Sequence, residues 1–322
     1  MYDSRQRSLF DISVDSHRTT FSGHESFPLR YTWLYKGVTN CSKNPEVFNQ
    51  EDAIAVLGVG KNMVRSIRYW CLATRMLEEV ASQKNSRAKH LQPSEIGSAI
   101  FLGKKAWDPY LEDIGTLWLI HYLLVTNSER ATTWFFAFNH VHYAEFSKNS
   151  LENALVDFLS SRKLSVPSRN TLKRDIDVLV RTYIPGKTSG KLSIEDAYDC
   201  PLIELDLLRP SYEEGTYSFS RGNQENLPNS IFAFALAEFI KNQAQGRKTV
   251  TFDEIAYAPY SPGKVFKLNE VSLSERLEEM GELTRGAWAY GETAGLKQLY
   301  INDDLDPFAL LEAHYLQTAH VG

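Results

Sequence analysis

The chain has 322 residues, 43% of them hydrophobic and 12% aromatic, so it is long and apolar enough to bury a sizeable core. Its formal net charge of −5 excludes a protein that coats DNA indiscriminately, because such coating needs an overall excess of cations. Any contact with nucleic acid must therefore be local.

The first twenty residues are polar and of mixed charge, which predicts a flexible arm and is unlike a signal peptide. No stretch of the chain approaches the roughly eighteen consecutive apolar residues that span a bilayer. The three cysteines are widely spaced and form no CxxC pair, which argues against a disulfide framework or a structural zinc site. We therefore expect a cytoplasmic protein without a membrane partner.

Residues 21–103 are predicted to be a first winged-helix-like domain that contains a helix-turn-helix. A short amphipathic helix over about 53–57 is broken by Gly58, because glycine adopts backbone conformations that end a helix. A second helix is expected from about Lys61 to Leu77. The polar residues 82–90 follow it as a predicted wing, as in DNA-binding proteins of this type.

The second helix of this domain carries an unusual concentration of positive charge. Val64, Ile67 and Cys71 have helical spacing and are predicted to face the core. The neighbouring face is expected to contact DNA and holds five candidate residues: Lys61, Asn62, Arg65, Arg68 and Tyr69. The alternative is a solvated helix face, but the glycine turn and the lack of acids between the cations favour phosphate contact.

Residues 104–208 are predicted to form a second, helical domain. Aromatic-rich stretches within 107–146 indicate two buried helices. The helix-turn-helix pattern then recurs in 147–184, where Ser150 is the expected cap of the first helix. Cations beside the apolar stripe of the second helix add three candidate DNA contacts: Lys173, Arg174 and Arg181.

Residues 209–322 are predicted to form a third, winged-helix-like domain. A strongly apolar helix over about 230–245 precedes a β-rich stretch over 248–257. An amphipathic helix over 271–284 then leads to a hairpin over 287–301 that resembles a wing. The chain as a whole is therefore predicted to be mainly α with small β-hairpins, an α+β fold of tandem winged-helix-like helix-turn-helix lobes.

The stretch FSGHESFP contains His24 next to Glu25, the candidate catalytic residues. A histidine beside a glutamate can act as an acid–base pair, or as a metal ligand together with a general base. The alternative is a hydrogen-bonded loop that packs on an aromatic core. Adjacent residues in an extended strand would also point to opposite faces.

The stretch WDPYLED supplies the candidate metal ligands Asp108, Glu112 and Asp113. On a helix the first two would be four residues apart, close enough to share a hard cation such as Mg²⁺. The alternative is that these carboxylates stabilise the N-terminus of a helix. Two other acids, Asp175 and Asp177, are expected to form local salt bridges with neighbouring cations.

Other catalytic signatures are absent from the sequence. It has no GxxxxGK[ST], GxGxxG, HExxH or GxSxG motif in a suitable context, and the pair His140 and His142 is weak evidence for a metal. Residue chemistry alone therefore leaves open whether the protein is an enzyme.

Five blocks of the sequence are similar to those of one bacterial family: FSGHESFPLRYTWLYKG, VFNQEDAIAVLGVGKNMVRSIRYWCLA, WDPYLED, TLKRDIDVLVRTY and DCPLIEL. That family is described as a domain of unknown function, and its genes lie beside those for DNA phosphorothioation. The resemblance covers about 21–208 and extends more weakly over the rest.

The resemblance implies a DNA nickase that cuts one strand with Mg²⁺, so that sulfur can replace a non-bridging phosphate oxygen in an anti-phage system. The cation would neutralise charge on the phosphate, and carboxylates would hold it. The implied partners are DNA, a cysteine desulfurase, an ATPase and an ATP pyrophosphatase-like sulfurtransferase, and the prediction allows a homodimer. The alternative is a non-catalytic winged-helix protein that binds DNA and acts as a scaffold or regulator of the same system.

Overall fold

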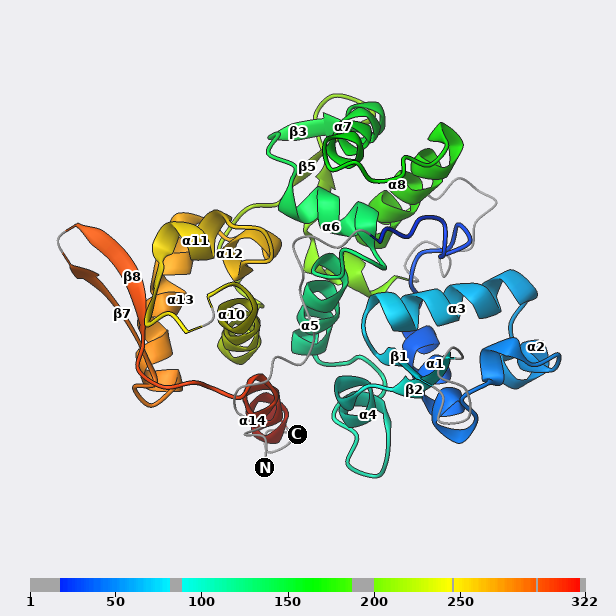
Figure 1. Ribbon diagram of the computed structural model, residues 1–322, viewed down its shortest axis with the longest axis horizontal. Helices are drawn as coiled ribbons and strands as arrows, with labels where there is room; N and C mark the ends of the chain where they lie inside the picture. The colour runs from blue at the N-terminus through cyan, green and yellow to red at the C-terminus, as the bar shows by residue number, and fades with distance from the viewer. Residues whose placement is uncertain (1–17, 82–88, 187–199, 245, 294, 319–322) are drawn as a thin grey trace. The chain divides into compact units, whose positions relative to one another are not determined.

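The structure, a computed structural model, contains mainly helices accompanied by small antiparallel sheets (Figure 1). It describes five stretches of the chain: residues 18–81, 89–186, 200–244, 246–293 and 295–318. The predicted α+β class with small hairpins is confirmed. Within these stretches no helix is long and apolar enough to cross a membrane.

The chain folds into two compact units. The N-terminal unit comprises the described residues up to 137 and those of 141–219, and the C-terminal unit comprises 138–140 and the described residues from 220 onward. The predicted arm over 1–20 lies outside the described residues as far as residue 17.

The N-terminal unit begins with helices and a two-stranded sheet. Its first elements are α1 (Tyr31–Lys43), η2 (Val47–Asn49), α2 (Ala53–Leu57), α3 (Lys61–Ala73), β1 (Leu77–Ala81) and β2 (Lys89–Pro93). Gly58 ends α2 with a φ of 64°, a left-handed conformation that glycine adopts without steric cost. The predicted turn therefore separates α2 from α3, and α3 ends four residues earlier than expected because Leu77 begins β1.

Strands β1 and β2 pair in antiparallel register, with Leu77 opposite Pro93 and Ala81 opposite Lys89. The wing predicted over 82–90 overlaps this pair. Its residues 82–88 lie outside the described part of the chain.

Three helices supply the aromatic core of the N-terminal unit. They are α4 (Glu95–Phe101), α5 (Ile114–Val125) and α6 (Thr132–Asn139). Every residue of α5 from Gly115 to its end is buried, which is expected of a helix that is apolar on all sides. The two predicted aromatic helices therefore exist, but the first begins at Ile114, so WDPYLED precedes the helix instead of belonging to it.

The second helix pair of the N-terminal unit packs beside a three-stranded sheet. Its elements are β3 (Glu145–Ser147), α7 (Lys148–Ser161), α8 (Arg169–Tyr183), η3 (Pro201–Leu205), β4 (Leu208–Pro210) and β5 (Thr216–Phe219), and the sheet order is β3-β5-β4. Ser147, not Ser150, is the N-cap of α7. The two serines form a reciprocal capping box, in which Ser150 completes the cap.

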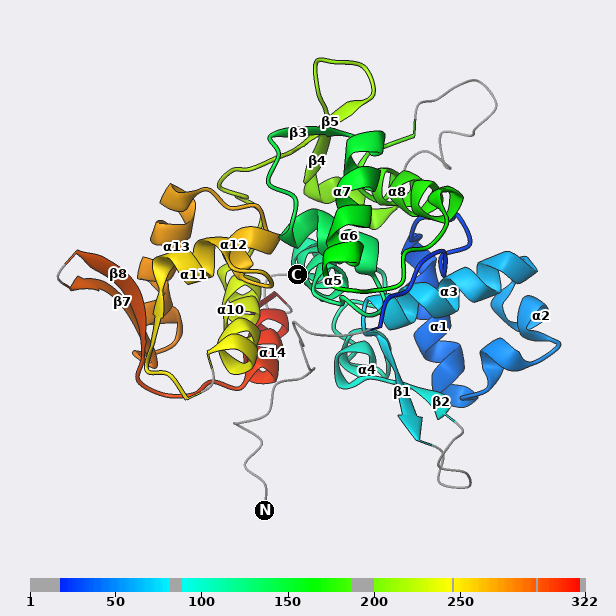
Figure 2. The same cartoon turned by 45° about the horizontal axis from the view of Figure 1, so that its top comes forward.

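The C-terminal unit combines helices with a second three-stranded sheet. Its elements are α10 (Asn229–Gln243), β6 (Thr249–Thr251), α11 (Phe252–Tyr257), α12 (Pro262–Val265), α13 (Glu270–Leu283), β7 (Trp288–Thr293), β8 (Leu296–Ile301) and α14 (Pro307–Thr318). The sheet order is β6-β8-β7, and the β7–β8 hairpin lies beside α13 (Figure 2). The stretch predicted to be β-rich is strand only over 249–251, because Thr251 and Glu254 form a capping box that starts α11.

Candidate nucleic-acid interface

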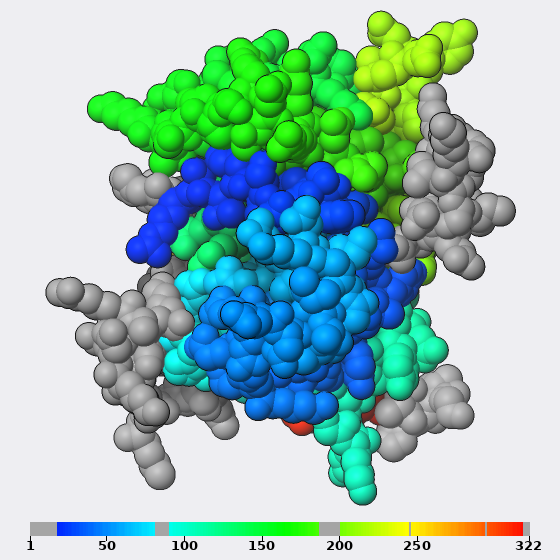
Figure 3. Space-filling model, turned by 90° about the vertical axis from the view of Figure 1, so that its right-hand side faces the viewer, coloured from blue at the N-terminus to red at the C-terminus, as the bar shows by residue number. Residues whose placement is uncertain are grey.

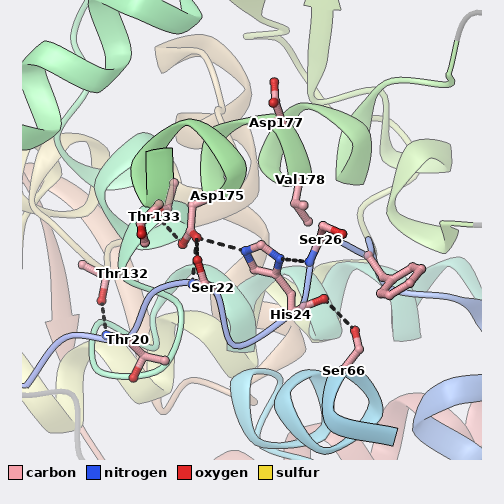
Figure 4. A network of polar contacts seen from close by, with 12 residues as sticks. Thr20, Ser22, His24, Ser26, Ser66, Thr132, Thr133, Asp175, Asp177 and Val178 are labelled. Atoms are coloured by element: carbon pink, nitrogen blue, oxygen red, sulfur yellow. Dashed lines mark hydrogen bonds and ion pairs between the residues drawn. The ribbon is translucent and has the colours of Figure 1, made fainter. Parts of the chain in front are cut away.

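The stretch of residues 20–28, the anchor segment, passes between α3 and α8 and is fixed by a buried aspartate on α8. Asp175 Oδ1 accepts a hydrogen bond from the backbone N–H of Ser22 at 2.8 Å, and His24 Nε2 lies 3.1 Å from the same oxygen. Thr133 donates to Asp175 Oδ2 at 3.1 Å (Figure 4). Because the carboxylate is only 1% exposed, these partners replace the water that it loses on folding.

The imidazole of His24 is completely buried at the centre of this network. Its Nδ1 accepts the backbone N–H of Ser26 at 3.2 Å, so the ring proton of the neutral form lies on Nε2, facing Asp175. The rings of Tyr69 and Trp134 meet it edge-on at centroid distances of 5.5 and 5.6 Å. Both nitrogens thus face groups inside the protein, the N–H of Ser26 and the carboxylate of Asp175, and the geometry suits an anchor better than the predicted acid–base catalyst.

The backbone of the anchor segment contains three left-handed residues other than glycine. Ser22, Glu25 and Ser26 have φ values of 58°, 54° and 82°. Such conformations are uncommon for residues with a side chain and persist where surrounding contacts enforce them. At Gly23 a Cβ would lie 2.4 Å from Cδ2 of Tyr69, so only glycine fits between the segment and α3.

Helices α3 and α8 both contribute an arginine to the anchor segment. Arg65 NH1 lies 3.2 Å from Glu25 Oε1, and Arg181 NH2 donates to the carbonyl oxygen of Ser26 at 2.6 Å. Partial burial lowers the pKa of the Arg181 guanidinium, an effect that the charge of Asp177 opposes. Glu25 therefore serves here as an ion-pair partner of Arg65.

Most of the predicted DNA contacts on α3 and α8 are exposed to solvent: Lys61, Asn62, Arg65, Lys173, Arg174 and Arg181. Arg68 is partly exposed and lies 3.3 Å from Glu79, which also pairs with Arg130 at 2.8 Å. An exposed pair such as Arg65–Glu25 contributes at most about 1 kcal/mol, so a phosphate can compete for the arginine.

Tyr69 is not part of the exposed face, contrary to the prediction. Its side chain is buried, and its ring packs edge-on against His24 and Trp70. Burial raises the pKa of Tyr69 well above its ordinary value, and the charge of Asp175 adds to this shift. The anchor segment covers the side of α3 on which Tyr69 lies, and the sequence pattern of α3 alone does not reveal that cover.

Figure 3 shows the face on which these elements meet. The anchor segment, in dark blue, crosses between the light-blue surface of α2 and α3 and the green surface of α7 and α8. The exposed cations of α3 and α8 thus belong to two helices that one strained segment ties together.

The predicted magnesium ligands do not form a metal site. Asp108 is buried, and its two carboxylate oxygens accept the backbone N–H groups of Glu112 and Asp113 at 2.8 and 3.1 Å. Asp113 in turn caps α5 by accepting the N–H of Gly115 at 2.7 Å. In the described ranges no group of three histidines, cysteines or acids could hold a metal ion, and this includes His140 and His142. These carboxylates therefore do not fit a bound Mg²⁺.

The central role of Asp175 was not predicted from the sequence. Of the two acids expected to form local salt bridges, Asp177 pairs with Lys148 at 2.6 Å, whereas Asp175 is buried against His24. Asp175 lies in helical register with the inner residues Leu172 and Ile176. A charged residue within an apolar stripe is the signal that could have identified it.

Comparisons with known proteins agree with the sequence resemblance. Residues 21–315 match a family model described as a protein of unknown function, DUF4007. A crystal structure of magnesium ion-bound SspB is 27% identical, with a TM-score of 0.83. A second SspB crystal structure is 28% identical, with a TM-score of 0.81, and each match covers 92% of this chain and 88% of the other. No curated protein matches the sequence.

Proposed function

Because the chain belongs to the DUF4007 family of proteins of unknown function, and its structure is similar to SspB, we propose that it is the DNA-binding component of a single-strand DNA phosphorothioation system. One observation carries the proposal. The exposed cations of α3 are presented without an acid in that helix, next to those of α8. A local basic face of this kind lets an acidic protein bind a phosphate backbone.

The element order of both units supports this proposal. In the N-terminal unit α3 follows a glycine turn and precedes the β1–β2 pair, and in the C-terminal unit α13 precedes the β7–β8 hairpin. Helices followed by a hairpin are typical of winged-helix proteins. We assign the tandem winged-helix-like lobes on this basis, with α3 as the helix that approaches DNA.

The finer proposal is that the protein cuts one strand of its DNA in this anti-phage system. It would act in the cytoplasm with a cysteine desulfurase, an ATPase and an ATP pyrophosphatase-like sulfurtransferase. The magnesium ion belongs to the SspB structure, and the candidate carboxylates of this chain do not fit such an ion. No catalytic step is therefore assigned to it.

The second candidate is a non-catalytic protein that brings the modification enzymes to DNA. The observation that favours it is the use of Asp108, Asp113 and His24 in internal hydrogen bonds. Groups that already hold the backbone in place, as Asp108 and Asp113 do for the residues that follow them, have a structural role that does not require a metal or a substrate.

Supercoiled plasmid distinguishes the two candidates. Purified protein is incubated with the plasmid in Mg²⁺ or in EDTA, and open circles are separated from retarded complexes on gels. Open circles that form only with the metal support the nickase, whereas retardation without cutting supports the scaffold. Absence of both would contradict the proposed DNA binding.

A further inference from the structure

The acid Asp108 determines the conformation of the turn WDPYLED. The carboxylate of Asp108 accepts the backbone N–H groups of Glu112 and Asp113. The backbone N–H of Asp108 donates to the carbonyl oxygen of Ile100 on α4 at 3.2 Å. Trp107 is fixed to α4 in the same way, through the carbonyl of Ala99 at 2.9 Å. A buried carboxylate thus shapes a rigid turn between α4 and α5.

This turn displays an aromatic side chain to solvent. Tyr110 is 70% exposed, between Pro109, whose ring restricts the backbone, and Leu111, which is buried and left-handed at a φ of 58°. The ring of Tyr110 is thus carried by a backbone that its neighbours fix, and most of its surface is accessible to a ligand.

A second tyrosine completes an aromatic surface. The ring of Tyr35 on α1 lies 6.2 Å from that of Tyr110, with 30° between the planes, and is itself 38% exposed. Its other neighbour is Phe101 of α4, met edge-on at 6.4 Å. Packing on Phe101 restricts the rotamers of Tyr35, so little side-chain entropy is lost when a planar ligand stacks there.

The charges around the turn favour a nucleic acid as that ligand. Lys104 and Lys105 are exposed in the loop that leads into the turn. Of the acids that follow, Asp108 is buried and held by two N–H groups, which leaves Glu112 as the exposed carboxylate beside Tyr110. Aromatic rings accompanied by lysines are the usual platform for unpaired bases, since every base has a face that can stack.

We propose that Tyr35 and Tyr110 form a stacking site for an unpaired base of a DNA strand. The inference rests on the proposed function, because the ends left by a cut in one strand can fray and expose unpaired bases. The site is distinct from the α3–α8 face, which binds the duplex backbone. Stacking at Tyr110 therefore adds affinity for single strands and leaves duplex binding unchanged.

The test compares two tyrosine variants of the full chain. Binding of a fluorescent 20-nucleotide oligothymidine and of a duplex of the same length is measured by anisotropy for Tyr110→Ala and Tyr212→Ala. Tyr212 is fully exposed on the same unit and serves as the matched control. We expect Tyr110→Ala to weaken single-strand binding about tenfold, with duplex binding unchanged, and Tyr110→Trp to restore it.

Each other outcome overturns the proposal. Equal single-strand binding by the Tyr110→Ala and Tyr212→Ala variants excludes stacking at Tyr110 and points to a protein ligand for this surface. An equal loss for single strand and duplex excludes selectivity for unpaired bases. If the unmodified protein binds neither DNA, the proposed function fails together with the stacking site, whereas duplex binding alone contradicts only the stacking site.

Discussion

Helices α3 and α13 occupy equivalent places in the two units, each before an antiparallel hairpin, yet they carry opposite charge. Helix α3 has three cations and no acid. Helix α13 exposes five carboxylates: Glu270, Glu275, Glu278, Glu279 and Glu282. Its only cation, Arg276, is turned inward, where it donates to the carbonyl oxygens of Leu227, Gln224 and Asn223.

This difference shows that element order alone does not define a nucleic-acid surface. A phosphate backbone near α13 would meet a row of like charges, whose repulsion opposes binding. The same order of helices and strands thus supports a basic surface in one unit and an acidic surface in the other. We expect DNA contact to be confined to the N-terminal unit.

The largest expected effect concerns the buried acid that holds the basic surface together. Replacing Asp175 with alanine leaves the N–H of Ser22 and the hydroxyl of Thr133 without their acceptor. We expect a loss of about 3 kcal/mol in the free energy of unfolding of the N-terminal unit. Hydrogen exchange should show amides of this unit exchanging about a hundredfold faster, while those of α10 and α13 keep their rates.

Asp177→Ala is the matched control, because Asp177 lies two residues away and pairs with Lys148 at the surface. It should change stability by less than about 0.5 kcal/mol. Equal effects of the two substitutions would contradict the anchoring role of Asp175.

The second prediction compares the loss of charged side chains from α3 with the same change on α13. Replacing Lys61 and Arg65 with alanine should weaken duplex binding about tenfold. A plot of the logarithm of affinity against the logarithm of salt concentration should also become less steep by about 2. Each phosphate contact that is lost means that about one counterion fewer is released on binding. Titrations at several salt concentrations measure this slope.

The matched substitutions on the acidic helix are Glu275→Ala and Glu278→Ala. They remove two exposed charges and should leave the slope unchanged if DNA contacts the N-terminal unit alone. A slope altered by the α13 pair and untouched by the α3 pair would reverse the assignment of the two surfaces.

The smallest expected effect is a pH dependence within the C-terminal unit. Burial by itself raises the pKa of Glu254, but hydrogen bonds from Thr251 and Arg247 outweigh it and lower the pKa below its ordinary value. A glutamate whose pKa is lower in the folded than in the unfolded protein stabilises the fold fully above its unfolded pKa of about 4.3. That contribution is lost as the pH falls through the pKa of the folded state. Glu254→Gln should therefore reduce the acid-induced fall in stability of this unit.

Thermal unfolding at pH 7 and about pH 3.5 measures this effect, with Glu278→Gln as the comparison on the exposed face of α13. The difference in melting temperature between the two pH values should shrink for Glu254→Gln and stay unchanged for Glu278→Gln. An unchanged difference for Glu254→Gln would show that its hydrogen bonds do not persist in solution.

The sequence predicted most helices because their apolar stripes and caps are local signals. The glycine turn before α3 and the strongly apolar helix α10 are examples. Strand β3 was not predicted, because it is three residues long and depends on pairing with β5, which lies far along the chain. The helical position given to WDPYLED was wrong because Asp108 turns the chain before α5 begins.

The candidate site was only partly visible in the sequence. The exposure of cations such as Lys61 and Lys173 could be predicted from their positions beside the apolar stripe of each helix. The partners of His24 do not, because they come from residues that are distant along the chain. Tyr69 was misplaced for the same reason, since a segment more than forty residues upstream covers it.

The anchor segment also constrains when this protein can become functional during its synthesis. Ser22 and its acceptor Asp175 are separated by 153 residues, so the segment leaves the ribosome long before α8 is made. Until then its three left-handed residues can be held only by contacts within the segment and with α3, such as the hydrogen bond from Ser66 to the carbonyl oxygen of His24. The basic surface is thus completed only after α8 has been made, and a nascent chain would acquire the proposed DNA-binding surface only from that point.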